Sequence, residues 1–432
     1  MAKKRIDFIT MGCSKNLVDT ELLMRQFVAS GYTVKHDPKT PTGQIAIINT
    51  CGFIGDAKEE SINTILQFAA RKQKGKLEKL YVMGCLSERY REILQAEIPE
   101  VDGFYGKFDH HKIIEHMQHT WDTSLASQRV LTTPNHYAYL KISEGCNRTC
   151  SYCAIPIITG HHKSRTIEDI LEEVTWLTRQ GVKEFQVIAQ DLSYYGIDLY
   201  KKMQLAELVN RIADVKGVEW IRLHYAYPAK FPYDILKVIR ERDNVCNYLD
   251  IALQHISDNM LKLMRRNITS QETYHLLQHI REEVPGIHLR TTLLLGHPGE
   301  TEDDVKELEE FVKKIRFERL GAFAYSDEDG TYANLHYKDD IEPEEKERRV
   351  ARIMRIQEDI SASINAQKVG TTLPVMIDRE EGDYYIGRTE YDSPDVDGEV
   401  LVNKNVSLQI GHIYQTHITA AEDFDLFGEV IV

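Results

Sequence analysis

The sequence predicts an α/β protein in three parts: a parallel-sheet domain, a partial barrel of strands and helices, and a small all-β domain. Three observations support this division. Strands and helices alternate three times in the first 120 residues, and six further strand–helix units follow in residues 136–366, a pattern typical of parallel sheets with right-handed crossovers. From about residue 367 onwards the pattern changes to short strands with alternating apolar residues, separated by turns.

Bulk composition excludes several classes of protein. A chain of 432 residues is long enough for two to four domains, and 42% hydrophobic and 28% charged residues are ordinary for a globular protein. No apolar run reaches the roughly 18 residues of a membrane-spanning helix, and the start lacks the apolar core of a signal peptide. Seven cysteines without a secretion signal fit a reducing cytoplasm better than a disulfide framework. The net charge of −14 argues against a general nucleic-acid binder.

The first domain, residues 1–120, places a cysteine after each of three expected strands: Cys13, Cys51 and Cys85. In a parallel sheet the carboxyl ends of all strands lie at one edge, so these cysteines should come together. A single buried cysteine is often only a small apolar side chain, but three in the same position predict a metal site with three thiolates. The expected elements are strands at 5–10, 45–49 and 79–83, and helices at 16–30, 56–72 and 87–96.

A Ser- and Thr-rich segment without periodicity, residues 121–135, is expected to link the first domain to the central one. Residues 136–366 should form a partial β/α barrel of the TIM type, which carries function at the carboxyl ends of its strands. Cys246 lies apart from these ends and is interpreted as structural. Expected strands begin near residues 137, 185, 220, 248, 288 and 320, and the polar residues at their ends are Gln190, Asp191, His224, Gln254, His255 and Ser326.

The motif C-x3-C-x2-C, made by Cys146, Cys150 and Cys153, directly follows the first expected barrel strand. Thiolates are soft ligands, suited to iron–sulfur clusters or zinc. A structural zinc site wants four ligands, and a cubane cluster usually takes four cysteines. Three cysteines therefore favour a cluster with one open iron that can bind a substrate. The alternative is zinc with His161 or His162 as the fourth ligand.

The third domain, residues 367–432, is expected to be a small β-barrel related to the OB type. It contains 13 acidic and 4 basic residues, so its net charge of −9 accounts for most of the charge of the chain. The expected strands are 373–377, 384–388, 399–402, 412–419 and 428–432.

The spacing of the central motif is that of the radical S-adenosylmethionine (SAM) enzymes, and the whole chain resembles their methylthiotransferase family. That family has a three-cysteine amino-terminal domain, a radical SAM barrel and a carboxy-terminal TRAM domain. The run Gly387–Gly398 resembles the branch that modifies small-subunit ribosomal protein S-twelve. The other matching runs are Gly12-Cys13-Ser14-Lys15-Asn16, Asn49-Thr50-Cys51, Gly84-Cys85, Ile142 through Pro156, and Pro298-Gly299-Glu300-Thr301.

The resemblance implies two [4Fe–4S] clusters and SAM as cofactors. The cluster on Cys146, Cys150 and Cys153 would cleave SAM reductively to a 5′-deoxyadenosyl radical. The auxiliary cluster, held by the three cysteines of the first domain, would present a sulfur that a further SAM methylates. Tyr152 would lie near the adenine or only pack the loop, and Gln190 and Asp191 would contact the SAM amino group.

The expected reaction is β-methylthiolation of an aspartate in protein S-twelve, a basic partner that the acidic third domain would dock through Asp392, Asp395 and Asp397. An electron donor such as flavodoxin or ferredoxin is implied, and no membrane. Two alternatives remain open. A tRNA adenosine methylthiotransferase has the same three domains, but phosphate contacts would favour a basic TRAM domain. The other is an iron–sulfur electron carrier without catalytic activity.

Overall fold

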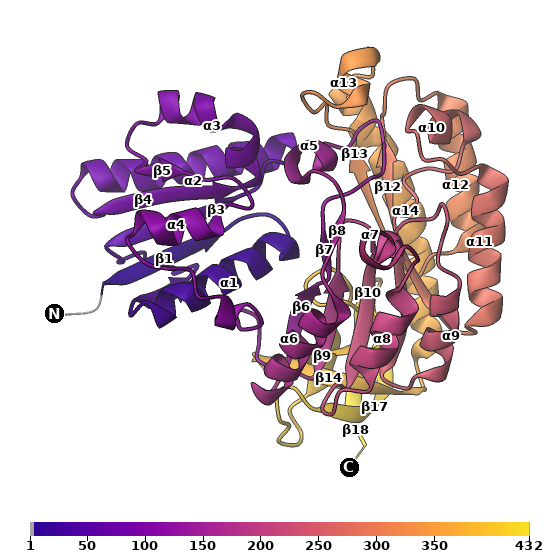
Figure 1. The fold of residues 1–432 in the computed structure, drawn as a ribbon. Coiled ribbons are helices and arrows are strands. Elements are labelled where there is room, and N and C mark those ends of the chain that lie inside the picture. The colour runs from indigo at the N-terminus through magenta and orange to yellow at the C-terminus, as the bar shows by residue number, and fades with distance from the viewer. Residues whose placement is uncertain (1–3, 432) are drawn as a thin grey trace.

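The computed structural model describes residues 4–431, and its amino-terminal domain is a five-stranded parallel sheet with helices on both faces (Figure 1). The strand order is β2-β1-β3-β4-β5, which places β1, β3 and β4 side by side. In chain order the elements are β1 (Arg5–Thr10), α1 (Ser14–Ala29), β2 (Thr33–His36), β3 (Ile45–Thr50), α2 (Gly55–Gln73), β4 (Lys79–Gly84), α3 (Cys85–Glu97), β5 (Gly103–Phe104) and α4 (His110–His116).

The central strand of this sheet, β3, is buried along its whole length because helices cover both of its faces. Ile45 and Ile47 pack on the side of α1, whereas Ala46 and Ile48 pack on the side of α2. This division follows from the alternation of side chains along a strand. The continuous apolar run that predicted a buried parallel strand is therefore divided between two cores.

The segment 121–135 holds the first two domains together and is not a free tether. It contains a short 3-10 helix, η1 (Thr123–Leu125). The buried side chain of Arg129 pairs with Glu21 of α1 at 3.1 Å and with Glu173 of the central domain at 3.0 Å. One guanidinium thereby joins a helix of each domain.

The central domain is an open, six-stranded parallel sheet with the order β13-β12-β11-β10-β9-β6, curved as a partial barrel. The six predicted strand–helix units are confirmed, and their apolar faces form one large core. The strands are β6 (Tyr137–Lys141), β9 (Glu184–Ile188), β10 (Trp220–Ala226), β11 (Val245–Ile251), β12 (His288–Leu295) and β13 (Arg319–Ala324). The main helices are α6 (Ile167–Arg179), α8 (Leu205–Ala213), α9 (Asp234–Glu241), α10 (Asp258–Leu263), α11 (Ser270–Glu283), α12 (Glu302–Ile315) and α14 (Pro343–Lys368).

Short elements line the carboxyl edge of this sheet, and their segments are too short to show a periodic pattern of apolar residues. They are β7 (Ser143–Glu144), α5 (Ile155–Thr159), β8 (Lys163–Ser164), η2 (Leu192–Tyr194), α7 (Ile197–Tyr200) and α13 (Tyr332–His336). Figure 1 shows α5 beside α3, at the boundary between the first two domains. Among the described residues, no helix is long and apolar enough to span a membrane.

The third domain is a closed five-stranded barrel with the order β14-β15-β16-β18-β17, as predicted. It packs below the amino ends of the central strands (Figure 1). Cys246 is buried there beside Trp220 and Tyr248 of the central domain and Met376 of the third domain. This position fits its interpretation as a structural residue. The strands are β14 (Thr372–Glu381), β15 (Tyr384–Thr389), β16 (Val400–Asn403), β17 (Ile413–Ala421) and β18 (Leu426–Val430).

Candidate active site

Cys13, Cys51 and Cys85, here called the N-terminal triad, lie together at the carboxyl edge of the first sheet. Cys13 precedes α1, Cys51 directly follows β3, and Cys85 is the first residue of α3. The loops are close: a Cβ placed on Gly12 would lie 2.9 Å from the Cys51 sulfur. The backbone of Gly12 also has a φ of +87°, a conformation that favours glycine. The topology of the sheet thus brings three residues distant in sequence to one place.

Asn16 ties the three cysteine-bearing loops to one another. Its Nδ2 donates to the Met11 carbonyl at 3.0 Å and to the Thr50 carbonyl at 3.2 Å. Its Oδ1 lies 3.7 Å from the Cys85 sulfur. The Asn16 side chain is buried, so the loss of these bonds would leave unsatisfied polar groups in the core.

Positive charge lies close to this triad. The buried ammonium of Lys107 donates to Asp19 at 2.9 Å and to Asn16 at 3.4 Å. Burial would raise the pKa of Cys13, but the charges of Lys15 and Lys107 outweigh it, with backbone hydrogen bonds, and lower that pKa. Burial dominates at Cys85 and raises its pKa to about 12. The positive environment favours thiolate ligands over thiols at Cys13.

Cys146, Cys150 and Cys153, here called the loop triad, lie on a folded-back loop between β7 and α5. The Cys146 amide donates to the Gly160 carbonyl at 3.1 Å, and the Ser151 amide donates to the Met264 carbonyl at 3.0 Å. Gly145 has a φ of +70°, and a Cβ there would lie 2.1 Å from the His161 carbonyl oxygen. The loop is therefore fixed at both ends, and Gly145 is required for the close approach.

Two residues that the sequence reasoning missed, Arg266 and Tyr227, contact the loop triad. Arg266 Nη1 donates to the Cys150 sulfur at 3.3 Å and to the Tyr152 hydroxyl at 3.1 Å. The Tyr227 hydroxyl lies 3.7 Å from the same sulfur and donates to the Arg266 carbonyl at 2.7 Å. Arg266 follows α10 and Tyr227 follows β10, and no motif spacing links either to the cysteines.

The three residues predicted to contact SAM differ in their surroundings. Tyr152 is half-buried and bonded to Arg266. Asp191 is buried and accepts from Arg148 Nε at 2.7 Å and from the Ser193 amide at 2.8 Å. Gln190 is half-buried, and its side chain makes no hydrogen bond within residues 4–431. Asp191 thus orients Arg148 of the loop, and the role of all three toward SAM stays a prediction.

The two triads face each other across the domain boundary. Cys85 forms one buried cluster with Ala154 and Ile158, which follow Cys153 in the chain. Lys141 of β6 pairs with Asp19 of the first domain. These contacts bring the loop triad and the N-terminal triad to the same interface.

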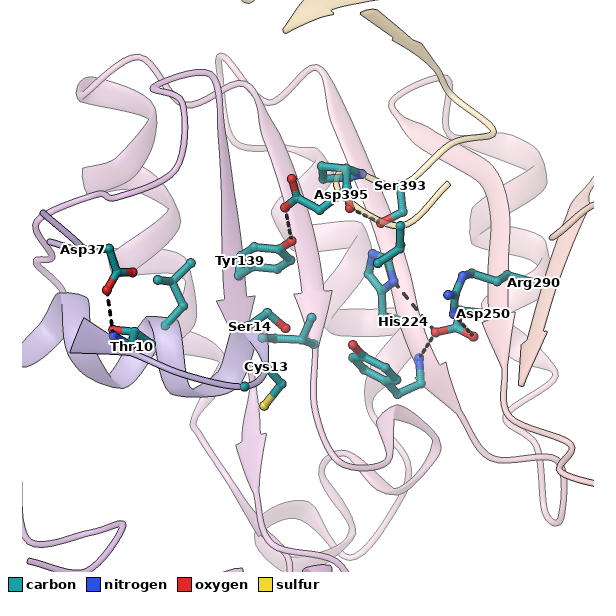
Figure 2. Close-up of a pocket in the computed structure, with 16 residues that line it drawn as sticks. Thr10, Cys13, Ser14, Asp37, Tyr139, His224, Asp250, Arg290, Ser393 and Asp395 are labelled. Carbon is teal, nitrogen blue, oxygen red and sulfur yellow. Dashed lines mark hydrogen bonds and ion pairs between the residues drawn. The ribbon is translucent and has the colours of Figure 1, made fainter. Parts of the chain in front are cut away.

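A pocket of about 340 Å³ opens beside the N-terminal triad (Figure 2). Figure 2 shows Cys13 and Ser14 on one side and His224, Asp250 and Arg290 on the other, with Asp395 at the rim. All three domains therefore contribute to its wall. His224 lies near the carboxyl end of barrel strand β10, where functional residues were predicted.

The donor sets fit iron–sulfur clusters better than zinc. Each triad offers three soft thiols, and the buried Arg266 Nε and Arg148 Nη2 have no partner within residues 4–431, which suits an anionic group. Within residues 4–431, no three Cys, His, Asp or Glu side chains are arranged closely enough to hold a single metal ion. His161 Nδ1 is bonded to Asn147 at 3.1 Å and His162 Nε2 to Ser164 at 3.0 Å. These bonds occupy one ring nitrogen of each histidine, whereas the other nitrogen of His162, Nδ1, is buried without a partner in residues 4–431.

The predicted docking role of Asp392 and Asp397 is wrong, because both carboxylates are internal counter-ions. Asp392 is buried and pairs with Arg319 of β13. Burial would raise its pKa, but Arg319 and Lys368 outweigh it and lower that pKa. Asp397 accepts from the Tyr248 hydroxyl at 2.9 Å and from Arg290 at 3.3 Å. The remaining carboxylate, Asp395, is exposed and accepts from the Tyr139 hydroxyl at 3.2 Å.

Comparison with known proteins matches each part of the chain. Residues 140–312 match the radical SAM superfamily, residues 369–431 match the TRAM domain, and residues 5–106 match an uncharacterised family, UPF0004. The radical SAM methyltransferase TsrM from Kitasatospora setae has a similar fold, with a TM-score of 0.54 at 14% identity over 77% of this chain and 74% of that one. The fold and the cysteine loop define a radical SAM enzyme.

Full-length relatives identify the family. The ribosomal protein uS12 methylthiotransferase RimO of Parabacteroides distasonis is 63% identical over 431 residues, which cover 100% of both chains. The RimO protein of Bacteroides thetaiotaomicron is 62% identical over 432 residues, covering 100% of this chain and 99% of its own. The chain belongs to the RimO family of methylthiotransferases. As a radical SAM enzyme of this family, it uses SAM and an iron–sulfur cluster.

Proposed function

We propose that this enzyme adds a methylthio group to the β-carbon of an aspartate in ribosomal protein uS12, the small-subunit protein S-twelve. The observation that carries the proposal is that Cys85 of the N-terminal triad packs against Ala154 and Ile158, directly after the loop triad, while a pocket opens beside Cys13. Two [4Fe–4S] clusters are proposed, one on each triad, together with SAM. A one-electron donor such as flavodoxin or ferredoxin would serve it in the cytoplasm.

The cofactors supply the chemistry, since no side chain of ordinary pKa removes a proton from an unactivated carbon. When bound, they provide reductive cleavage of SAM to a hydrogen-abstracting 5′-deoxyadenosyl radical, a sulfur atom, and the methyl group that it carries. The chain provides position and charge. Arg266 and Tyr227 hold Cys150, Asn16 holds the N-terminal triad, and the Asp19–Lys141 pair fixes one triad relative to the other.

The charge of the third domain supports a protein substrate over tRNA. Its net charge of −9 would repel phosphates, whereas nucleic-acid affinity depends on basic contacts. Some carboxylates of this domain are internal, but others are exposed on its surface and make no ion pair within residues 4–431. They include Asp383, Glu422, Asp423 and Glu429. We infer that this surface accelerates the encounter with a Lys- and Arg-rich protein.

A purified reaction tests the proposal. Anaerobically reconstituted enzyme, SAM and a low-potential reductant are incubated with uS12 from a strain that lacks the enzyme, or with bulk tRNA from that strain. We expect uS12 to gain about 46 Da, the mass of an added SCH2 unit, on an aspartate-containing peptide. Reactions without SAM give the control. A methylthiolated nucleoside in the tRNA, with uS12 unchanged, would contradict the proposal.

A further inference from the structure

Lys15 is a nearly buried lysine on the first turn of α1, next to the N-terminal triad. Only 6% of its surface is exposed. Its ammonium makes no hydrogen bond or ion pair with any group of residues 4–431, and it lies 3.6 Å from the centroid of the Tyr225 ring. A buried cation needs an anionic or strongly polar partner to offset its lost hydration. The aromatic face supplies only part of that stabilisation.

The ammonium acts on three groups that line the pocket. Burial is the largest influence on the pKa of each: it raises the pKa of Cys13 and of Asp250 and lowers that of His224. The charge of Lys15 acts to lower all three pKa values; the pKa of Cys13 ends below its usual value, whereas that of Asp250 stays raised. Lys15 therefore lies next to the pocket, directly after Cys13 and Ser14 of its wall. Its ammonium lies over the ring of Tyr225, and Tyr225 lines the pocket that Figure 2 shows.

The other charges around this pocket already have partners. Asp250 accepts from the Tyr225 amide at 3.3 Å and lies 3.7 Å from Arg290. Arg290 donates to Asp397 at 3.3 Å. Asp395 accepts from the Tyr139 hydroxyl. Lys15, next to this pocket, is thus a charged group that has no counter-ion within residues 4–431.

Tyr225 holds its ring under this ammonium at a cost in backbone strain. Its φ is +66°, in the left-handed region that bulky residues rarely adopt. The hydrogen bond from its amide to Asp250 fixes that conformation. Such strain is found where the surrounding structure needs a particular side-chain position, as at binding sites.

We propose that Lys15 binds the side-chain carboxylate of the substrate aspartate. The inference rests on the proposed function. In aspartate the carboxylate is bonded directly to the β-carbon that reacts, so a cation beside the N-terminal triad would hold that carbon next to the sulfur source. A carboxylate entering this pocket loses part of its water and would gain a charge-assisted hydrogen bond from the ammonium. An asparagine or a purine offers no negative charge, so Lys15 determines specificity for aspartate.

A double substitution, one in each partner, tests this pairing. Binding of uS12 to reconstituted enzyme is measured by equilibrium titration, with uS12 carrying either the acceptor aspartate or asparagine in its place. We expect Lys15→Met to weaken binding of the aspartate form roughly 10- to 100-fold, as for a lost hydrogen bond to a charged group. The asparagine form should bind wild type and Lys15→Met equally. Lys15→Arg, which keeps the charge, should restore part of the affinity.

Lys76→Met is the matched control, since Lys76 is an exposed lysine at the opposite edge of the same sheet. Iron content, measured for each variant, reports whether the N-terminal triad is intact. Equal weakening of both uS12 forms, no weakening, or weakened binding of SAM in place of uS12 would each overturn the inference. If the wild-type enzyme leaves uS12 unmodified in the purified reaction, the proposed function itself is contradicted, and the inference about Lys15 is contradicted with it.

Discussion

At the scale of single residues, Arg266 is the side chain that connects the loop triad to the barrel. It donates to the Cys150 sulfur, the Tyr152 hydroxyl and the Ala252 carbonyl. Burial opposes its charge, but Tyr152, Cys150 and Tyr227 outweigh that effect and raise its pKa, so it stays a cation. A buried cation next to a cysteine sulfur should stabilise the more negative, reduced form of a cluster.

Arg266→Met should therefore lower the reduction potential of the cluster on the loop triad by tens of millivolts, where roughly 60 mV corresponds to a tenfold change for one electron. Arg266→Lys should give a smaller decrease, because it keeps the charge but loses the forked geometry. A potentiometric titration followed by electron paramagnetic resonance measures both. Arg265→Met serves as the control, since Arg265 contacts the Tyr332 ring and no cysteine. An unchanged potential in Arg266→Met would contradict this role.

At the scale of elements, the third domain is held to the barrel by a buried network of charges. Arg388 of β15 donates to Glu184 of β9 at 2.7 Å and to Asp378 of β14 at 2.6 Å. His136, just before β6, lies 2.8 Å from Asp378. Burial would raise the pKa of Asp378, but Arg388 and His136 outweigh it and lower that pKa to about 2.

Asp378→Asn should destabilise the apoprotein by roughly 2 kcal/mol near neutral pH, the free energy that corresponds to this shift in pKa. The folded pKa is depressed, so the contribution is present above the usual pKa of 3.8 and is lost as the pH falls toward 2. Thermal unfolding followed from pH 6 to pH 2 should show a constant difference between wild type and variant down to about pH 4 and a narrowing difference below it. Asp383→Asn, at an exposed turn of the same domain, should behave as wild type. A constant difference across this range would contradict the assignment.

Periodicity predicted most of these elements, because apolar residues must face a core. Edge strand β2 was missed, since its half-exposed residues carry no apolar run. The acidic residues of the third domain were misjudged for a related reason. A sequence shows that Asp392 is charged, but only the fold shows that it is buried against Arg319. Local pattern therefore predicts elements better than it predicts which charges pair across them.

At the scale of the whole molecule, the positions of the two triads have different origins. The gathering of Cys13, Cys51 and Cys85 follows from parallel-sheet topology alone and was predictable. The approach of the triads to each other was not, because it depends on charges that resemble ordinary surface residues. Arg89 of α3 pairs with Glu328 of the central domain at 2.8 Å, and Asp19 pairs with Lys141. Packing between domains decides that both sites share one interface.

The central claim is that one chain holds two clusters with separate roles, and substitution of each triad tests it most directly. Wild type should load about eight irons per chain. Replacing the N-terminal triad with alanine should halve the iron and abolish methylthiolation of uS12, while 5′-deoxyadenosine still forms from SAM. Replacing the loop triad should abolish 5′-deoxyadenosine. Cys246→Ala, which removes the buried structural thiol, is the control. Full iron content after loss of the N-terminal triad, or methylthiolation that survives it, would contradict the account.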